Sequence, residues 1–187
     1  MSLMEMLFSE LVDFYERIEA ITGRIEMTNL LVEMLRKAPS EVIDKVVYLT
    51  QGKLYPDFVG LEIGVAEKLA VKALTIVVGK GEEEVEGLYK ELGDLGIVAE
   101  TLLKKKVQLT LMQRPLTVDL VYDLFEKMAR ASGSGSIDVK VRYLCSLLND
   151  ATPKEARYIM RTALGRLRLG VADMTILDAL AIAYGGG

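Results

Sequence analysis

The chain has 187 residues, of which 51% are apolar, with no histidine, one cysteine and a formal net charge of −4. This size and composition predict a real hydrophobic core, in one domain or two closely packed lobes. The lack of histidine excludes histidine-based general base catalysis and most catalytic zinc sites. A single cysteine excludes an internal disulfide framework and suits a reducing compartment. Because Cys145 lies among apolar residues, we expect a buried structural thiol.

Charged residues also exclude a membrane protein. No run of about 18 uncharged apolar residues, the length that spans a bilayer, occurs in the sequence, and Glu5, Glu10 and Asp13 interrupt its start. We therefore expect neither a membrane span nor a secretory segment. Between Arg130 and Gly170, eight basic and three acidic residues give a net charge of +5, whereas the remainder carries −9. Such a basic region can bind a polyanion although the whole protein is acidic.

Taken in order, the first half of the sequence predicts helix after helix and no convincing strand. Apolar residues recur at spacings of three and four from Leu3 to Ile21, which is typical of an amphipathic helix. Two shorter helices are expected over about 27–36 and 40–49, and a turn-rich connection over 50–64 follows them. The stretch from Glu62 to Val78 reads as helix, although its end, IVVG, would also suit a short strand.

Further helices are predicted in the second half by their polar starts. After the glycines at 79 and 81, the acidic start of GEEEVEGLYKEL suits the positive end of a helix dipole. Asp94 is expected to cap the exposed amides of the next helix, and Thr117 those of another amphipathic helix. Asp173 or Thr175 is expected to cap the last helix, after which the glycines at 185–187 read as an unfinished connection.

The clearest local signals lie in ATPKEARYIMRTALGRLRLGVAD. Thr152, Pro153 and Glu155 form a capping box, so a helix should begin sharply here. At roughly 100° per residue its apolar positions share one face. Three arginines fall within about 40° of each other beside that face, namely Arg157, Arg161 and Arg168.

This arginine row has two interpretations. Arg166 projects elsewhere, and Gly165 and Gly170 bracket RLRL, so that a backbone or a ligand could approach closely. A row of guanidinium groups next to glycine suits phosphate contacts. A solvated helix face, with arginine stems covering apolar surface, gives the same pattern.

The run EARYIMRTALGRLRLGVAD, from Glu155 to Asp173, resembles the end of the N-terminal DNA-binding domain of ATP-dependent DNA ligases of the archaeal and eukaryotic replicative type. QGKLYP (51–56), ELGDLGIVAE (91–100) and SGSGS (132–136) resemble segments of that family in the same order, so the resemblance covers most of the chain. It implies an all-α fold of about ten to twelve helices in two packed sub-bundles, with residues 1–187 as one DNA-binding domain.

The resemblance also implies a function. The domain would bind double-stranded DNA through the minor groove and the backbone without reading sequence, since nicks must be sealed anywhere in replication, recombination and repair. The parent enzyme would use ATP and Mg²⁺ in separate adenylation (nucleotidyltransferase) and OB domains. Because no K-x-D-G adenylation motif occurs in these residues, we expect the fragment to hold no cofactor and to be inactive alone. Expected partners are nicked DNA, those downstream domains and, as a further candidate, a sliding clamp, but no membrane; the expected location is cytoplasmic and nucleoid-associated, or nuclear in a eukaryote.

The SGSGS segment suits a flexible linker or an ordered loop whose amides and hydroxyls meet a sugar-phosphate strand. The similar loop of the family touches the DNA minor groove, which implies this role here. Relatives tend to carry more basic residues just after the loop, where this chain has Asp138 and Val139, so contact there should be weaker, with Arg142 as a candidate to compensate. The lysines at 104–106, which suit a helix end, become secondary candidates. No catalytic or metal-binding residue is expected, and the expected DNA contacts are Gly133, Ser134, Gly135, Ser136, Lys140, Arg142, Arg157, Arg161, Arg166, Arg168, Lys104, Lys105 and Lys106.

Two other classes of function fit the residues. An all-α adaptor that binds protein partners without DNA would use the same amphipathic helices, and its signature would be an exposed apolar patch. A small-molecule enzyme without histidine would need clustered carboxylates or an activated lysine. Glu82 to Glu84 suit a solvated helix start instead.

Overall fold

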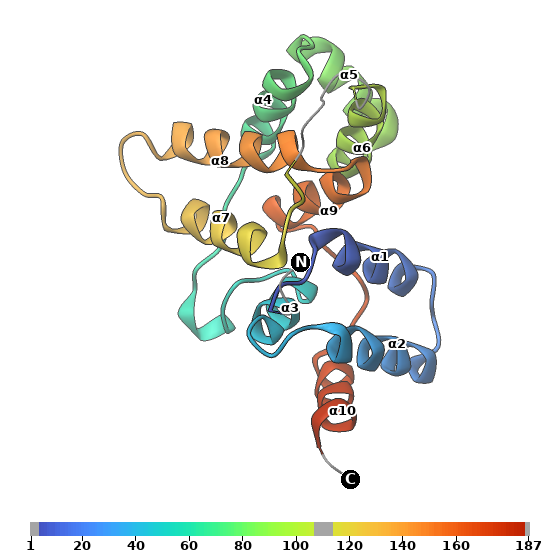
Figure 1. The fold of residues 1–187 in the computed structure, drawn as a ribbon. Helices are drawn as coiled ribbons and strands as arrows, with labels where there is room; N and C mark the ends of the chain where they lie inside the picture. Colours follow the sequence, from blue (N-terminus) through green and yellow to red (C-terminus); the bar gives the residue numbers. More distant parts are fainter. Residues whose placement is uncertain (1–3, 107–113, 186–187) are drawn as a thin grey trace.

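The structure, a computed structural model, describes residues 4–106 and 114–185 (Figure 1). In this part of the chain the only β-type pairing is a single bridge between Leu7 and Thr117, so the predicted all-α fold is confirmed. No helix within these ranges is long and apolar enough to cross a bilayer. Ten α-helices and one 3₁₀-helix form the described residues: α1 (Phe8–Glu19), α2 (Arg24–Lys37), α3 (Ile43–Thr50), η1 (Asp57–Val59), α4 (Glu67–Val78), α5 (Glu82–Leu92), α6 (Leu95–Lys106), α7 (Val118–Arg130), α8 (Ser136–Asp150), α9 (Pro153–Ala163) and α10 (Asp173–Tyr184).

The helices pack in two groups that share one core. α4, α5 and α6 lie at the top of Figure 1 with α8 and α9 below them, and α2 and α10 pack together at the bottom. α1, α3 and α7 connect the two groups, because α1 packs on both α2 and α9, and α7 on both α3 and α8. Buried side chains from both groups, such as Leu31 of α2, Leu74 of α4 and Ile159 of α9, belong to one hydrophobic cluster. Cys145 is buried in it and burial raises the pKa of its thiol, which confirms the predicted structural cysteine.

Polar caps fix two helix starts as the sequence predicted. The Asp94 side chain accepts hydrogen bonds from the backbone amides of Gly96 (2.6 Å) and Ile97 (3.2 Å) at the start of α6. The Thr117 hydroxyl accepts from the amide of Leu120 (3.1 Å) at the start of α7. Both caps satisfy amides that have no partner inside their helix.

Other helix starts differ from the prediction. α1 begins at Phe8 instead of Leu3, α2 at Arg24 instead of about residue 27, and α3 at Ile43 instead of about residue 40. The helix expected from Glu62 begins at Glu67, because Gly64 adopts a left-handed conformation (φ 65°) and residues 62–66 run outside any helix. The alternative of a strand at IVVG is wrong, since Ile76–Val78 end α4. α10 begins at Asp173 after Ala172, and no side chain caps it.

Candidate nucleic-acid interface

α9, the arginine-bearing helix, begins with the predicted capping box. The Thr152 hydroxyl accepts a hydrogen bond from the amide of Glu155 (3.2 Å), and the Glu155 carboxylate accepts one from the amide of Thr152 (2.8 Å). Pro153 occupies the first helical position, where its missing N–H costs nothing. Glu155 is buried, and this burial raises the pKa of its carboxyl group. The capping box therefore fixes the start of α9 through the buried Glu155, although Thr152 itself is exposed.

α9 crosses α6 at unusually close range, at Gly96. A Cβ atom added to this buried glycine would lie 2.7 Å from the carbonyl oxygen of Arg157 and 2.9 Å from Cγ of Arg161. Real side chains do not tolerate such distances, so only glycine lets the two helices meet here. This crossing places the α9 arginines directly against α6.

Two of these arginines are tied to carboxylates of neighbouring helices. Arg157 forms an ion pair with Glu100 of α6, and Arg161 pairs with Asp94 (2.8 Å) and with Glu19 of α1 (3.1 Å). The Arg157 and Arg161 side chains are only 23% and 18% exposed. Burial alone would raise the pKa of Asp94, but the hydrogen bond and the charge of Arg161 lower it. Both guanidinium groups thus clamp α9 to its neighbours, and their role as DNA contacts stays a prediction.

The prediction that Arg168 continues the helical row is wrong, because α9 ends before it. The amide of Gly165 donates to the carbonyl of Thr162 (3.1 Å), and the amide of Arg166 donates to that of Arg161 (2.8 Å). Gly165 itself is left-handed (φ 69°). This is the Schellman ending of a helix, in which the glycine reverses the chain. Residues 166–172 therefore form a surface connection to α10.

The arginines of this connection differ from those of α9 in exposure. Arg166 pairs with Glu67 of α4 and donates to the hydroxyl of Tyr89 in α5 (3.1 Å), yet its side chain remains 47% exposed. Arg168 is exposed and makes no ion pair or side-chain hydrogen bond with another described residue. These two guanidinium groups are more accessible to a ligand at the surface than those of α9.

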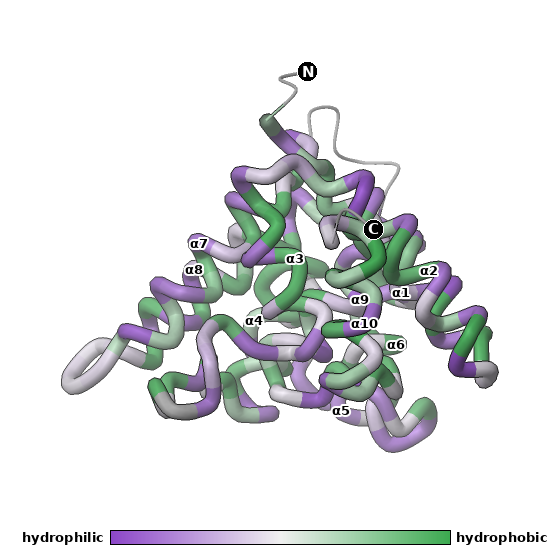
Figure 2. Tube along the Cα trace, turned by 90° about the horizontal axis from the view of Figure 1, so that it is seen from below, coloured by the Kyte–Doolittle hydropathy of each residue, from purple (hydrophilic) through white to green (hydrophobic). Residues whose placement is uncertain are grey.

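The SGSGS segment forms an ordered turn between α7 and α8. Gly133 and Gly135 are left-handed (φ 75° and 81°), and the amide of Ser136 donates to the carbonyl of Gly133 (3.3 Å). α7 and α8 pack against each other, so the segment is the loop of a helical hairpin and not a linker between lobes. It projects from the left edge of the molecule in Figure 2, and an added Cβ at either glycine would meet nothing within 4 Å. A strand of a ligand could therefore approach its backbone closely.

The segment 62–66 brings these two loops to one surface. The ammonium group of Lys140, in the first half of α8, donates to the carbonyl of Gly64 (3.1 Å). The amide of Val65 donates to the carbonyl of Ala163 (3.4 Å), at the end of α9. The SGSGS loop with Lys140 and the connection with Arg166 and Arg168 therefore flank the same segment. We call these residues, 62–66, 132–140 and 165–170, the glycine-loop surface.

Arg142 is not part of the glycine-loop surface. It follows Lys140 by two positions, which turns it by about 200° around α8. Its guanidinium is exposed and lies over the ring of Tyr143, 5.4 Å from the ring centroid. The compensating role predicted for Arg142 has no geometric support, and its DNA contact stays a prediction.

The lysines at the end of α6 lie elsewhere on the molecule. Lys106 donates to the carbonyl of Val77 in the last turn of α4, whereas Arg166 pairs with Glu67 in its first turn. These two positions on α4 are about 15 Å apart at 1.5 Å per residue. Lys104 pairs with Glu100 (3.0 Å). Lys104, Lys105 and Lys106 thus form a separate group, and their phosphate contacts stay a prediction.

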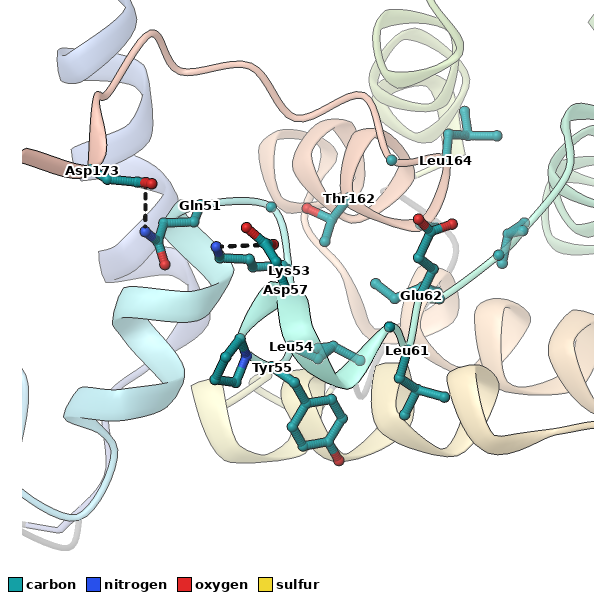
Figure 3. A pocket seen from close by; sticks show the side chains of 18 of the residues that line it. Gln51, Lys53, Leu54, Tyr55, Asp57, Leu61, Glu62, Thr162, Leu164 and Asp173 are labelled. Carbon is teal, nitrogen blue, oxygen red and sulfur yellow. Dashed lines mark hydrogen bonds and ion pairs between the residues drawn. The ribbon is translucent and has the colours of Figure 1, made fainter.

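A cleft lies between residues 51–65 and the end of α9 (Figure 3), and it shares residues 62–65 and Gly165 with the glycine-loop surface. Its charged side chains are Lys53, which bonds to Asp57 (3.2 Å), together with Glu62 and Asp173. One lysine among three carboxylates makes the cleft a poor phosphate site. The sequence predicts this stretch only as a turn-rich connection that resembles a family segment. A signal of close backbone approach was present in its three glycines, which are left-handed in the structure: Gly52, Gly60 and Gly64.

The groups that hold Arg166 are not predicted by the sequence. Periodicity places Glu67 in one helix and Tyr89 in another, acidic one, without indicating that either contacts Arg166. Both come from helices that are distant in sequence from Arg166, by 99 and 77 residues. Helical periodicity carries no information on such pairs, so no signal in the sequence identified them.

Comparison with known proteins agrees with the fold and with the resemblance. The family described as "DNA ligase N terminus" matches residues 7–181. The chain is 55% identical to DNA ligase 2 of Thermofilum pendens over 96% of this chain and 31% of that protein. It is 53% identical to the DNA ligase of Staphylothermus marinus (97% and 32%) and 48% identical to that of Nitrosopumilus maritimus (97% and 31%). The chain thus spans about a third of the length of these curated relatives. It belongs to the family of DNA ligase N-terminal regions.

Proposed function

We propose that this chain binds duplex DNA as part of an ATP-dependent DNA ligase. It would contact the minor groove and the sugar-phosphate backbone without sequence specificity. The observation that carries the proposal is the glycine-loop surface, where two loops with left-handed, unobstructed glycines flank the segment 62–66. Backbone groups at such glycines can approach a nucleic-acid strand closely. Contacts to phosphate and sugar position a protein without specifying sequence, which suits an enzyme that seals nicks anywhere.

Donors for phosphate oxygens come from three sources on this surface. α8 begins directly after Gly135 without a side-chain cap. The amide of Ser136 donates to the carbonyl of Gly133, but the amides that follow it in the first turn, and the positive dipole end of the helix, can meet an anion. Lys140 spends one of its three donors on Gly64. Arg166 and Arg168 supply exposed guanidinium groups. The proposed contacts are Gly133, Ser134, Gly135, Ser136, Lys140, Arg166 and Arg168.

The relatives are DNA ligases by name, which supports the wider proposal that the whole protein seals nicks in duplex DNA during replication, recombination and repair. This chain has no K-x-D-G motif, so adenylation with ATP and Mg²⁺ would take place in adenylation and OB domains outside it. Those domains and nicked DNA are the proposed partners, with a sliding clamp as a further one. An enzyme with this substrate would work where the genome is, in the cytoplasm with the nucleoid, or in a nucleus.

α10 carries the exposed apolar side chains that an adaptor would use. Met174, Leu177, Ile182 and Tyr184 are between 55% and 60% exposed, while Ile176 and Ala179 of the same helix are buried. A helix that is apolar all round is normally covered on all sides. Because the relatives are about three times as long as this chain, we propose that the rest of the ligase covers this face. An adaptor without DNA binding remains the second candidate.

Fluorescence anisotropy with nicked and intact duplexes of two unrelated sequences tests the proposal. Affinities for the two sequences should agree within about twofold, and log affinity should fall linearly with log salt, with a slope of about −3.6 to −5.4 for four to six phosphates. As a control, Arg24→Ala removes an exposed arginine on α2, remote from the glycine-loop surface, and should leave binding nearly unchanged. Strong preference for one sequence, or no salt dependence, would contradict the proposal. A defined protein partner without DNA binding would favour the adaptor.

A further inference from the structure

Arg166 is held at both its backbone and its side chain. Its amide closes the Schellman ending of α9 by donating to the carbonyl of Arg161 (2.8 Å). Its guanidinium pairs with Glu67 and donates to the hydroxyl of Tyr89, which itself donates to Glu67 (3.1 Å). Three side chains from three elements thus form a closed ring of hydrogen bonds. An arginine in a surface connection would otherwise sample many rotamers.

The ring leaves Arg166 free to bind an anion as well. A guanidinium has five N–H donors, and the ring uses one toward Glu67 and one toward Tyr89. The side chain is about half exposed, and its neighbour Gly165 has open space where a Cβ would stand. The donors that remain can form the paired hydrogen bonds with which arginine binds phosphate.

We propose that Glu67 and Tyr89 are positioning residues that fix Arg166 for a backbone phosphate of the bound DNA. This inference rests on the proposed function. Both residues act through Arg166: they hold its guanidinium in one orientation, so that it binds a phosphate without first losing side-chain freedom. The hydrogen bonds from Arg166 and Tyr89 lower the pKa of Glu67, so the carboxylate keeps its charge at neutral pH.

The proposal predicts that removing the Glu67 carboxylate weakens DNA binding, whereas its charge alone would predict stronger binding. Removing a carboxylate near a polyanion should strengthen binding if only the net charge matters. If Glu67 positions Arg166, removing it should weaken binding. Glu67→Ala and Glu67→Gln lose the same charge, but the glutamine keeps an oxygen that can accept from Arg166. Positioning therefore predicts tighter binding for Glu67→Gln than for Glu67→Ala, whereas charge alone predicts no difference.

The experiment measures duplex affinity across a salt series for wild type and variants. Glu67→Ala should weaken binding about fivefold and reduce the salt slope by about 0.9, the contribution of one phosphate. Tyr89→Phe, which changes no charge, should weaken binding about twofold to threefold by removing one of the two anchors. Glu33→Ala is the matched control, because Glu33 is also exposed and paired with an arginine, Arg17 (3.1 Å), but on α2. It should leave affinity unchanged or slightly raised, and thermal melts should confirm that every variant is folded.

A double-mutant cycle tests whether Glu67 affects DNA affinity through Arg166. In an Arg166→Ala background, Glu67→Ala should cause no further weakening, since no guanidinium is left to position. Binding of Glu67→Ala at or above wild-type affinity, or an undiminished effect in the Arg166→Ala background, would overturn the inference while the proposed function stands. No binding of the wild-type chain to any duplex would overturn both.

Discussion

Replacing Gly96 by alanine should destabilise the protein by forcing α6 and α9 apart. The added methyl group would lie 2.7 Å from the carbonyl oxygen of Arg157 and 2.9 Å from a carboxylate oxygen of Asp94. The first of these atoms belongs to the backbone of α9, so no change of side-chain rotamer relieves the clash. Moving α9 away would also loosen the pair between Arg161 and Asp94.

The size of the effect follows from three contributions. Overpacking of a tight interior costs about 1–3 kcal/mol. Weakening a charge-assisted hydrogen bond such as that between Arg161 and Asp94 adds about 1 kcal/mol. Alanine returns up to about 1 kcal/mol because it favours the helix more than glycine does. The free energy of unfolding should therefore fall by about 2 kcal/mol, which lowers the melting temperature by about 4–8 °C in a domain of this size.

Urea unfolding followed by circular dichroism at 222 nm measures this change, and Gly87→Ala is the matched control. Gly87 is also a helical glycine, in α5, but it is exposed and an added Cβ would meet nothing within 4 Å. Its replacement should raise the free energy of unfolding by about 0.5–1 kcal/mol through helix propensity alone. If Gly96→Ala were as stable as wild type, or if both variants shifted stability in the same direction, the close crossing of α6 and α9 would be refuted.

Three further predictions concern pH, the loop and the arginines. Burial would raise the pKa of Asp94, but Arg161 lowers it below its ordinary value of 3.8. The ionised Asp94 carboxylate therefore stabilises the fold fully above pH 3.8, and this stabilisation is lost as the pH falls through the lowered pKa. Urea midpoints between pH 2.5 and 7 should therefore fall less steeply toward acid in Asp94→Asn, and equal slopes would contradict the ion pair. Ser136→Glu places a carboxylate in the first turn of α8, so the melting temperature should hold or rise while duplex affinity drops several-fold by repulsion; unchanged affinity would exclude this helix start from the interface. Arg168→Ala should weaken binding about threefold to tenfold at an unchanged melting temperature, whereas Arg157→Ala should lower the melting temperature because Glu100 then loses a partner in a buried site. The reverse pattern would assign the two arginines the opposite roles.

The parts of the fold that local sequence determines were predictable. The capping box at Thr152 and the caps at Asp94 and Thr117 depend on residues within three positions of each other, and all three are present in the structure. The end of α9 was also locally encoded, because Gly165 is a typical C-terminal helix signal. Apolar periodicity that continues through RLRL outweighed this signal in the prediction, so Arg168 was placed on the helix.

The roles of the arginines could not be predicted, since they depend on partners far away in the sequence. Arg161 and Glu19 are 142 residues apart, and Arg157 and Glu100 are 57 apart. A helical pattern shows that an arginine lies beside the apolar face, but a solvated side chain and an ion-paired one have the same pattern there. The glycine-loop surface could not be predicted for the same reason, because Lys140 and Gly64 are far apart in the sequence and meet only in the folded chain.

Hydrogen–deuterium exchange of the chain with and without a nicked duplex tests the central claim most directly, because it locates the bound surface without any substitution. We predict slower exchange on binding in residues 62–66, 132–140 and 165–170, with little change in α2 and α10. Protection confined to α2 and α10, or to the end of α6 around Lys104–Lys106, would show that DNA binds a different face and would contradict the proposed interface.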